Sequence, residues 1–233
     1  MRGIPQGPTA HLHYHERRKS NEIVLIGGTG NMGSRVVTEL ISRNHTVTAV
    51  VWRPKEVPAH PTVMVKRSDV SDERDLLALL AGHDAIVSSL RLSEIDPPKL
   101  IDSVRTSGVR RYVVVGGAGS LEVSPGVRLI DTERISKQVR PEAAAGVAFL
   151  NLLDEEEQLN RTFISPSVMF VPDERTGKFR IGDDSLLTGP EGSRISFEDF
   201  ALALVDELET TSHRQRRFRL GTNAAAQGMM ISK

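Results

Sequence analysis

Residues 22–33 read EIVLIGGTGNMG, and this stretch decides the fold. The apolar run at residues 23–26 is short and ends in glycines, as expected of a strand that is buried on both faces. Segment 31–43 follows with apolar residues three or four positions apart, which predicts a helix. A strand, a glycine-rich turn and an amphipathic helix in this order predict a dinucleotide-binding site.

The turn itself satisfies the spacing Gly28-x-Gly30-x-x-Gly33. Glycine is required because the turn is tight, because the backbone approaches a pyrophosphate, and because the helix packs close to the strand. The N–H groups and the positive dipole end at the start of the helix then bind the phosphates. The predicted cofactor contacts in this turn are Gly27, Thr29, Gly30, Asn31, Met32 and Gly33.

Strands and helices continue to alternate along the chain. Hydrophobic patterning and cap residues predict further strands at 46–52, 62–65, 85–87 and 112–115, and helices at 71–80 and 97–106. Right-handed crossovers between parallel strands place helices on both faces of the sheet. The alternation therefore predicts an α/β fold with a doubly wound parallel sheet of the Rossmann type.

The pattern beyond residue 140 is less regular. It predicts helices at 142–159 and from 196 to about 208, strands at 162–165, 178–181 and 194–196, and an edge strand at 218–220. No internal repeat interrupts the order, so a single domain over residues 21–222 accounts for it.

The two ends of the chain are interpreted as tails, at residues 1–20 and 223–233. The first is polar and contains His11, His13 and His15, which would share one side of an extended chain. These histidines could form a metal site, but no carboxylate or thiolate lies at a spacing that would complete the set of metal ligands. We favour a tail outside the fold and expect no metal.

The composition excludes several classes of site and partner. With 30 basic and 30 acidic residues, no net charge favours nucleic acid or an anionic membrane. The absence of cysteine excludes disulfides, zinc–thiolate sites, iron–sulfur clusters and thiol catalysis. No apolar run approaches the roughly 20 residues that span a bilayer. We therefore expect a cytoplasmic protein that acts on a small molecule.

The residues after the second strand indicate which dinucleotide binds. An NAD site typically has Asp or Glu about 20 residues past the glycines, on the ribose hydroxyls. Trp52 and Arg53 occupy that place here, with Lys55 close behind. Arginine offers a planar fork to a 2′-phosphate, which an acid would repel. We predict a preference for NADP(H); NAD(H) is the alternative if Arg53 is only a surface residue.

Two more strand ends supply candidate cofactor contacts. Asp69 and Val70 follow the third strand, where Asp69 either lies over the adenine or caps the next helix. Ser88, Ser89 and Leu90 end the fourth strand at the carboxyl edge, where doubly wound sheets bind ligands. We predict that all five contact the cofactor.

Several motifs in the same order resemble the atypical short-chain dehydrogenase/reductases, in particular their NmrA-like NAD(P)H-binding subgroup. The resemblance covers residues 22–221. Besides the first turn, it rests on VVGGAGSL at 114–121, TFISPS at 162–167, RTGK at 175–178, SRIS at 193–196 and DFA at 199–201.

The resemblance implies a Rossmann fold with a small, partly irregular C-terminal portion that closes over the nicotinamide. It implies that Gly116 and Gly117 lie in a loop along the cofactor and that Ser165 and Pro166 lie beside the nicotinamide. The family includes NADPH-dependent reductases of quinones, flavins and tetrapyrroles. It also includes non-catalytic sensors of the NADP redox state.

The catalytic pair of many short-chain dehydrogenases is absent from this sequence. That pair is a tyrosine four residues before a lysine, which lowers the tyrosine pKa for proton exchange. The two tyrosines, Tyr14 and Tyr112, have Arg18 and Gly116 at that position. The remaining candidate is Ser120, just past the fifth strand, which either orients an acceptor or only satisfies its own turn.

Two functions fit a dinucleotide site without a proton donor. A conjugated acceptor such as a quinone or flavin takes a hydride while water supplies the proton, so positioning is the main requirement. We expect an NADPH-dependent reductase of such an acceptor. The alternative is a non-catalytic NADP(H) sensor, which the missing phenol favours and the compact C-terminal portion disfavours.

Overall fold

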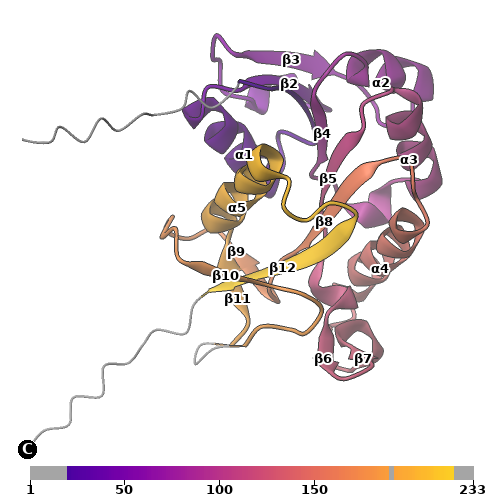
Figure 1. The fold of residues 1–233 in the computed structure, drawn as a ribbon, viewed down its shortest axis with the longest axis vertical. Coiled ribbons are helices and arrows are strands. Elements are labelled where there is room, and N and C mark those ends of the chain that lie inside the picture. The colour runs from indigo at the N-terminus through magenta and orange to yellow at the C-terminus, as the bar shows by residue number, and fades with distance from the viewer. Residues whose placement is uncertain (1–19, 189–191, 223–233) are drawn as a thin grey trace, which may run out of the picture.

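The computed structural model describes residues 20–188 and 192–222, so the three alternating histidines and the second predicted tail lie outside the described residues. Its centre is an eight-stranded sheet with helices on both faces (Figure 1). The predicted α/β fold with a doubly wound, mostly parallel sheet is confirmed.

The strands of the main sheet are β1 (Glu22–Ile26), β2 (Thr46–Val51), β3 (Val63–Arg67), β4 (Ala85–Ser88), β5 (Arg111–Val115), β8 (Asn160–Ser165), β10 (Phe179–Gly182) and β12 (Arg216–Thr222). The helices are α1 (Asn31–Ser42), α2 (Glu73–Leu80), α3 (Pro97–Thr106), α4 (Arg140–Asp154) and α5 (Phe197–Thr210). Two small sheets pair β6 (Glu122–Ser124) with β7 (Val127–Arg128), and β9 (Met169–Val171) with β11 (Arg194–Ser196).

The strand order is β10-β12-β8-β5-β4-β1-β2-β3, and all neighbours run parallel except β10 and β12. From β1 the chain moves outward to β2 and β3, and then returns to the other side of β1 at β4. A ligand crevice forms beyond the carboxyl ends of the strands where the order reverses in this way. The topology therefore locates the site at the carboxyl ends of β1 and β4.

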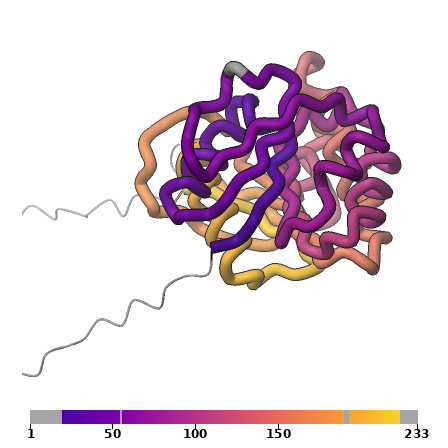
Figure 2. The backbone as a smooth tube through the Cα atoms, turned by 90° about the horizontal axis from the view of Figure 1, so that it is seen from above, coloured from indigo at the N-terminus to yellow at the C-terminus, as the bar shows by residue number. Residues whose placement is uncertain are grey.

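The sheet is packed on both faces, and each face has its own core. α1 and α5 cover one face, where Leu40 and Leu204 are fully buried. α2, α3 and α4 cover the other face (Figure 2). Leu80 and Phe149 are fully buried there. The runs of apolar residues in β1 and β5 are explained by this burial on both faces.

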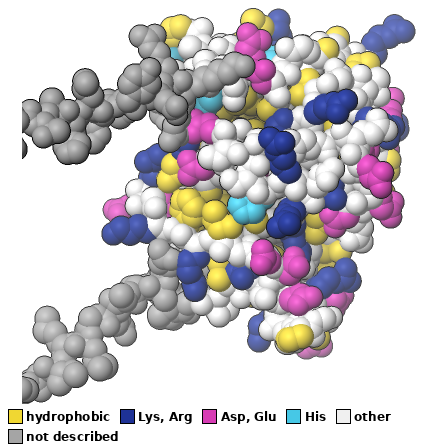
Figure 3. All heavy atoms as spheres, in the orientation of Figure 1, with side chains coloured by type: hydrophobic (Ala, Val, Ile, Leu, Met, Phe, Trp, Pro, Cys, Tyr) yellow, Lys and Arg dark blue, Asp and Glu magenta, His cyan; other side chains and the backbone are white. Residues whose placement is uncertain are grey.

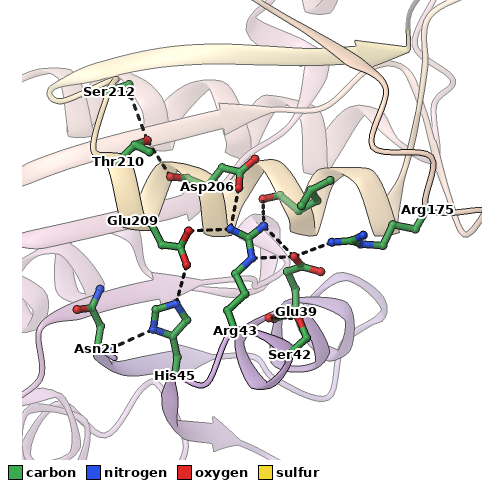
Figure 4. A network of polar contacts seen from close by, with 11 residues as sticks. Asn21, Glu39, Ser42, Arg43, His45, Arg175, Asp206, Glu209, Thr210 and Ser212 are labelled. Atoms are coloured by element: carbon green, nitrogen blue, oxygen red, sulfur yellow. Dashed lines mark hydrogen bonds and ion pairs between the residues drawn. The ribbon is translucent and has the colours of Figure 1, made fainter. Parts of the chain in front are cut away.

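A polar network joins the end of α1 to α5 (Figure 4). The guanidinium of Arg43 lies 2.8 Å from Glu39, 2.7 Å from Asp206 and 2.8 Å from Glu209. Arg175 adds a second cation, 3.0 Å from Glu39. The two helices are therefore held together by ion pairs as well as by their apolar faces, which fixes the orientation of α1 on the sheet.

The expectation of an edge strand at 218–220 is wrong. β12 is longer and lies inside the sheet, between β8 and β10. Phe218 and Leu220 face the core under α1 and α5, whereas the alternate residues are arginines that resemble a solvent face in sequence. Arg217 is buried all the same, with 13% of its side chain exposed, because it makes polar contacts described below.

The predicted helix at 142–159 begins at Arg140 and ends at Asp154. Residues 155–159 instead reverse the chain so that β8 can pair in parallel with β5. No helix within the described ranges, 20–188 and 192–222, is long and apolar enough to cross a membrane. On the face drawn in Figure 3, basic and acidic side chains are interspersed.

Candidate functional site

The start of α1 is open to an anion. Gly30 precedes the helix without a capping side chain, and the first turn contains no acidic residue. In contrast, α2, α3 and α5 are capped by the side chains of Asp72, Asp96 and Ser196, and α4, which also lacks a side-chain cap, has Glu142 in its first turn. An uncapped helix start offers unsatisfied N–H groups and the positive end of the helix dipole to a negatively charged ligand.

The glycines of the turn are required for different reasons. Gly27 has φ = 89°, and a Cβ there would lie 2.2 Å from the Ser89 carbonyl oxygen. A Cβ on Gly33 would lie 2.0 Å from the Gly27 carbonyl oxygen, so close packing of α1 on the turn requires this glycine. On Gly30, however, the nearest atom would be 3.5 Å away, an ordinary contact. Packing does not require glycine at position 30, where the missing side chain leaves room for a ligand to approach the backbone.

A cavity of about 660 Å³ extends from the start of α1 to the start of α4, and we call it the main cavity. It is lined by eight of the predicted cofactor contacts, Gly30, Asn31, Met32, Ser89, Leu90, Gly116, Gly117 and Pro166. Gly27, Thr29 and Gly33 belong to the turn beneath it but do not line it. The point at which the strand order reverses, at the carboxyl ends of β1 and β4, therefore coincides with a cavity.

Two predicted contacts have their side chains in the protein interior. The hydroxyl of Ser88 is buried and lies 2.9 Å from the Tyr112 hydroxyl. Ser165 is fully buried as well, and its Oγ has no hydrogen-bond partner among the described residues. Neither residue lines the main cavity. Their neighbours in the chain, Ser89 and Pro166, line it instead.

Ser120, the candidate for orienting an acceptor, does not line the main cavity either. Its hydroxyl lies 2.7 Å from Nη1 of Arg217, which also donates to the Ser120 carbonyl oxygen at 2.9 Å. Asp184 holds the other guanidinium nitrogen. Ser120 thus lines a separate polar cavity of about 590 Å³ behind the glycine-rich loop. This position favours the alternative in which Ser120 stabilises its own loop and does not orient an acceptor. No local pattern points to Arg217 as its partner, because the two residues are 97 positions apart.

Two arginines lie at the carboxyl ends of β2 and β3. Arg53 has 71% of its side chain exposed and lies 3.1 Å from Glu56. The guanidinium of Arg67 lies 5.5 Å from the centroid of the Trp52 ring, which is also exposed. Sequence reasoning missed Arg67; the signal was its position as the last residue of β3, opposite the end of β2.

Asp69 does not cap the next helix, so that alternative is wrong. Asp72 caps α2, whereas Asp69 Oδ1 accepts hydrogen bonds from the N–H and hydroxyl of Ser71, at 2.9 and 2.8 Å. These bonds lower the pKa of the Asp69 carboxyl. Val70 packs against the core under α2, α3 and α4. The adenine contact remains a prediction for both residues.

Most of the remaining wall of the main cavity is apolar. It comes from segments to which the sequence assigned no role, and includes Leu92, Leu129, Ile135, Val139, Val168, Phe170 and Phe197. The single carboxylate in the wall, Glu142, accepts hydrogen bonds from the N–H of Leu92 at 2.8 Å and from the N–H of Ser93 at 3.0 Å. It therefore fixes the loop after β4 to α4.

No tyrosine lines this cavity in the part of the chain that the structure describes. Tyr112 is fully buried in β5, and burial raises its pKa despite the hydrogen bond with Ser88. Glu142 is occupied by the loop after β4. The cavity thus offers an anion site at one end and an apolar wall, without a paired acid and base.

Comparison with known proteins agrees with this geometry. A family model described as NAD(P)H-binding matches residues 27–210. YwnB of Bacillus subtilis is 30% identical over 211 residues, which cover 87% of this chain and 99% of that protein.

Two solved structures are similar over their whole length. A provisionally assigned epimerase from Bacteroides thetaiotaomicron has a TM-score of 0.84 at 37% identity, covering 88% of this chain and 98% of its own. A provisionally assigned NADH-flavin reductase from Streptococcus pneumoniae has a TM-score of 0.77 at 32% identity, covering 88% and 100%.

Proposed function

This chain belongs to the NAD(P)H-binding family, and we propose that it is an NADPH-dependent reductase of a flat, conjugated acceptor such as a quinone or a flavin. We place it in the NmrA-like subgroup on the motifs quoted above. The observation that carries the proposal is the main cavity, which joins an uncapped helix start to a mostly apolar wall that contains no tyrosine and no free carboxylic acid.

The residues of the turn fit a dinucleotide. The start of α1 lacks both a cap and an acidic residue, and Gly30 leaves space that packing does not require. We expect the N–H groups of Asn31 and Met32 to bind the pyrophosphate and the loop at Gly116 and Gly117 to lie along the nicotinamide side. When bound, the reduced nicotinamide supplies the hydride.

The preference for NADP(H) is supported by Arg53 and Arg67. Both are cations at the carboxyl ends of neighbouring strands, where the ribose of the adenosine half is expected. Arg67 carries no ion pair among the described residues, and its guanidinium lies over Trp52. Arg53 has to exchange Glu56 for the 2′-phosphate, an exchange that favours the phosphate because of its greater charge.

Calorimetric titration with NADPH and NADH tests this preference. Arg53→Gln is expected to weaken NADPH binding by at least about tenfold, because a hydrogen-bonded charge pair contributes roughly 1.5–3 kcal/mol when well formed. NADH binding should hardly change. Arg110→Gln is the control, since Arg110 is exposed beside the amino end of β5. Equal loss of both cofactors, or of neither, would refute the role of Arg53.

The chemical class of the acceptor is inferred from the side chains that line the main cavity. Reduction of a simple ketone requires a proton donor at the carbonyl oxygen, but the described wall contains no tyrosine, histidine or lysine and its one carboxylate is occupied. A quinone or flavin accepts the hydride on a delocalised ring and takes its proton from water. Apolar residues such as Val139, Val168 and Phe170 provide contact area for such a ring.

The same lack of a proton donor favours a second candidate, a non-catalytic NADP(H) sensor. A sensor requires different affinities for the oxidised and reduced cofactor, because a ligand that binds two states equally shifts neither. The ratio of the dissociation constants for NADP⁺ and NADPH therefore separates the two functions. A ratio near one would exclude sensing.

Anaerobic oxidation of NADPH across quinones, flavins, tetrapyrroles and simple carbonyls tests the reductase. Saturable turnover of one conjugated class, with none of the simple carbonyls, is the expected result. Tight NADPH binding without turnover on any acceptor would refute the reductase and favour the sensor.

A further inference from the structure

The main cavity contains one positive charge that the protein does not neutralise. Its charged lining residues are Arg91, Arg134 and Glu142. Arg91 lies 3.3 Å from Glu94, and the Glu142 carboxylate is occupied by the loop after β4. Arg134 is exposed, and its side chain makes no hydrogen bond or ion pair with residues 20–188 or 192–222; it lines a cavity whose wall is rich in apolar groups.

The backbone that carries Arg134 is held in place. Arg140, the first residue of α4, donates to the carbonyl oxygens of Ile130 at 2.8 Å and Thr132 at 2.6 Å. The Thr132 hydroxyl donates to the Leu129 carbonyl oxygen at 2.7 Å and accepts from the N–H of Arg134 at 3.2 Å. These hydrogen bonds preorganise the backbone, so binding of a ligand by Arg134 has to order only its side chain.

Exposed apolar side chains line the same cavity as this charge and are open to a ligand. Val139 is 56% exposed and Val168 is 50% exposed, and both line the main cavity. Exposed apolar groups next to a guanidinium without a partner fit a ligand that has an apolar body and an anionic group. The pyrophosphate is expected at the start of α1, which packs on the opposite face of the sheet from α4. Arg134 is therefore available to the second ligand.

We infer that the acceptor is a conjugated ring system that carries an anionic group, such as a phosphate, carboxylate or sulfonate, and that Arg134 binds this group. The inference rests on the proposed function, since it assigns a charge to the acceptor of that reaction. Arg134 selects among acceptors and takes no part in hydride transfer.

Pairs of probes that share a ring and differ in charge test the inference. We choose riboflavin with FMN, and 1,4-naphthoquinone with its 2-sulfonate, titrated in the presence of NADP⁺ so that no reduction occurs. The variants are Arg134→Gln, which removes the charge, and Arg134→Lys, which keeps it. Lys137→Gln is the matched control, because Lys137 is an exposed cation three positions on that does not line the cavity.

The unmodified protein should bind the anionic member of each pair about tenfold more tightly, as expected of one charge-assisted contact. Arg134→Gln should bring the ratio close to one by weakening only the anionic probes. Arg134→Lys should restore part of the ratio, and Lys137→Gln should leave it unchanged.

Several results would overturn the inference. These are equal binding of neutral and anionic probes by the unmodified protein, an unchanged ratio in Arg134→Gln, and no binding of either pair. Weaker NADP⁺ binding in Arg134→Gln with an unchanged ratio would assign Arg134 to the cofactor instead. Because binding is measured without turnover, a protein that selects anionic probes but never reduces them would refute only the reductase.

Discussion

Alanine substitution at two glycines of the turn separates the role of packing from the role of ligand binding. Gly33 and Gly30 are three residues apart in the same turn, and neither has a positive φ. A Cβ on Gly33 would lie 2.0 Å from the Gly27 carbonyl oxygen and 3.1 Å from the Gly28 Cα, so backbone has to move. A Cβ on Gly30 meets nothing closer than 3.5 Å.

The expected magnitudes follow from these contacts. Overpacking against backbone costs up to about 3 kcal/mol, and alanine in a helix recovers about 1 kcal/mol relative to glycine. Gly33→Ala is therefore expected to lower the free energy of unfolding by about 2 kcal/mol, which is roughly 4–8 °C in Tm for a domain of this size. For Gly30→Ala, the cost at an N-cap and the gain in backbone entropy are both below about 1 kcal/mol and nearly cancel.

Thermal unfolding without cofactor and calorimetric titration with NADPH measure the two effects independently. Gly30→Ala should unfold within about 2 °C of the unmodified protein. Its NADPH affinity should fall at least about tenfold, because the methyl group displaces the pyrophosphate from one or more N–H groups. Unchanged NADPH affinity in Gly30→Ala would refute the assignment of this turn. A loss of stability equal to that of Gly33→Ala would refute the separation of roles.

Three further substitutions probe the scaffold. Arg43→Met should lower Tm by roughly 6–12 °C while leaving NADPH affinity intact, because breaking a mostly buried ion-pair network costs about 3 kcal/mol. Tyr112→Phe leaves the Ser88 hydroxyl buried without its partner and should cost about 1–3 kcal/mol in urea unfolding. Adding Ser88→Ala should recover part of that cost, and no recovery would contradict the pairing. Burial raises the pKa of Glu198, but hydrogen bonds from the Asp173 N–H and from Arg35 outweigh it, so the pKa lies below its ordinary 4.5. A carboxyl with a depressed pKa stabilises the fold at pH values above its ordinary pKa. This contribution is lost as the pH falls through the lower pKa of the folded protein. Glu198→Gln should therefore lower the free energy of unfolding at neutral pH, and this loss should shrink in acid. A loss that grows in acid would show that the pKa of Glu198 is raised and not lowered.

The sequence by itself determined the fold class and the location of the glycine-rich turn before the first helix. Both depend on local patterns, since residues 22–33 contain a buried strand, a turn and the start of a helix in one continuous segment. The carboxyl ends of β4 and β5 were also predictable, because parallel strands meet at one edge of the sheet. For this reason Ser89, Leu90, Gly116 and Gly117 all line the main cavity.

Only the tertiary structure decided which way the side chains point and which residues neutralise one another. Ser120 has the sequence position of a ligand contact, yet Arg217, 97 residues away, holds its hydroxyl on the other side of the loop. Ser88 ends a strand at the right edge, yet its side chain faces the core and Tyr112. Arg134 differs from Arg91, the other arginine in this wall, because no acid reaches it in space. Contacts between distant segments leave no periodic signal in a single sequence, so the charge balance of the cavity becomes visible only when the chain is folded.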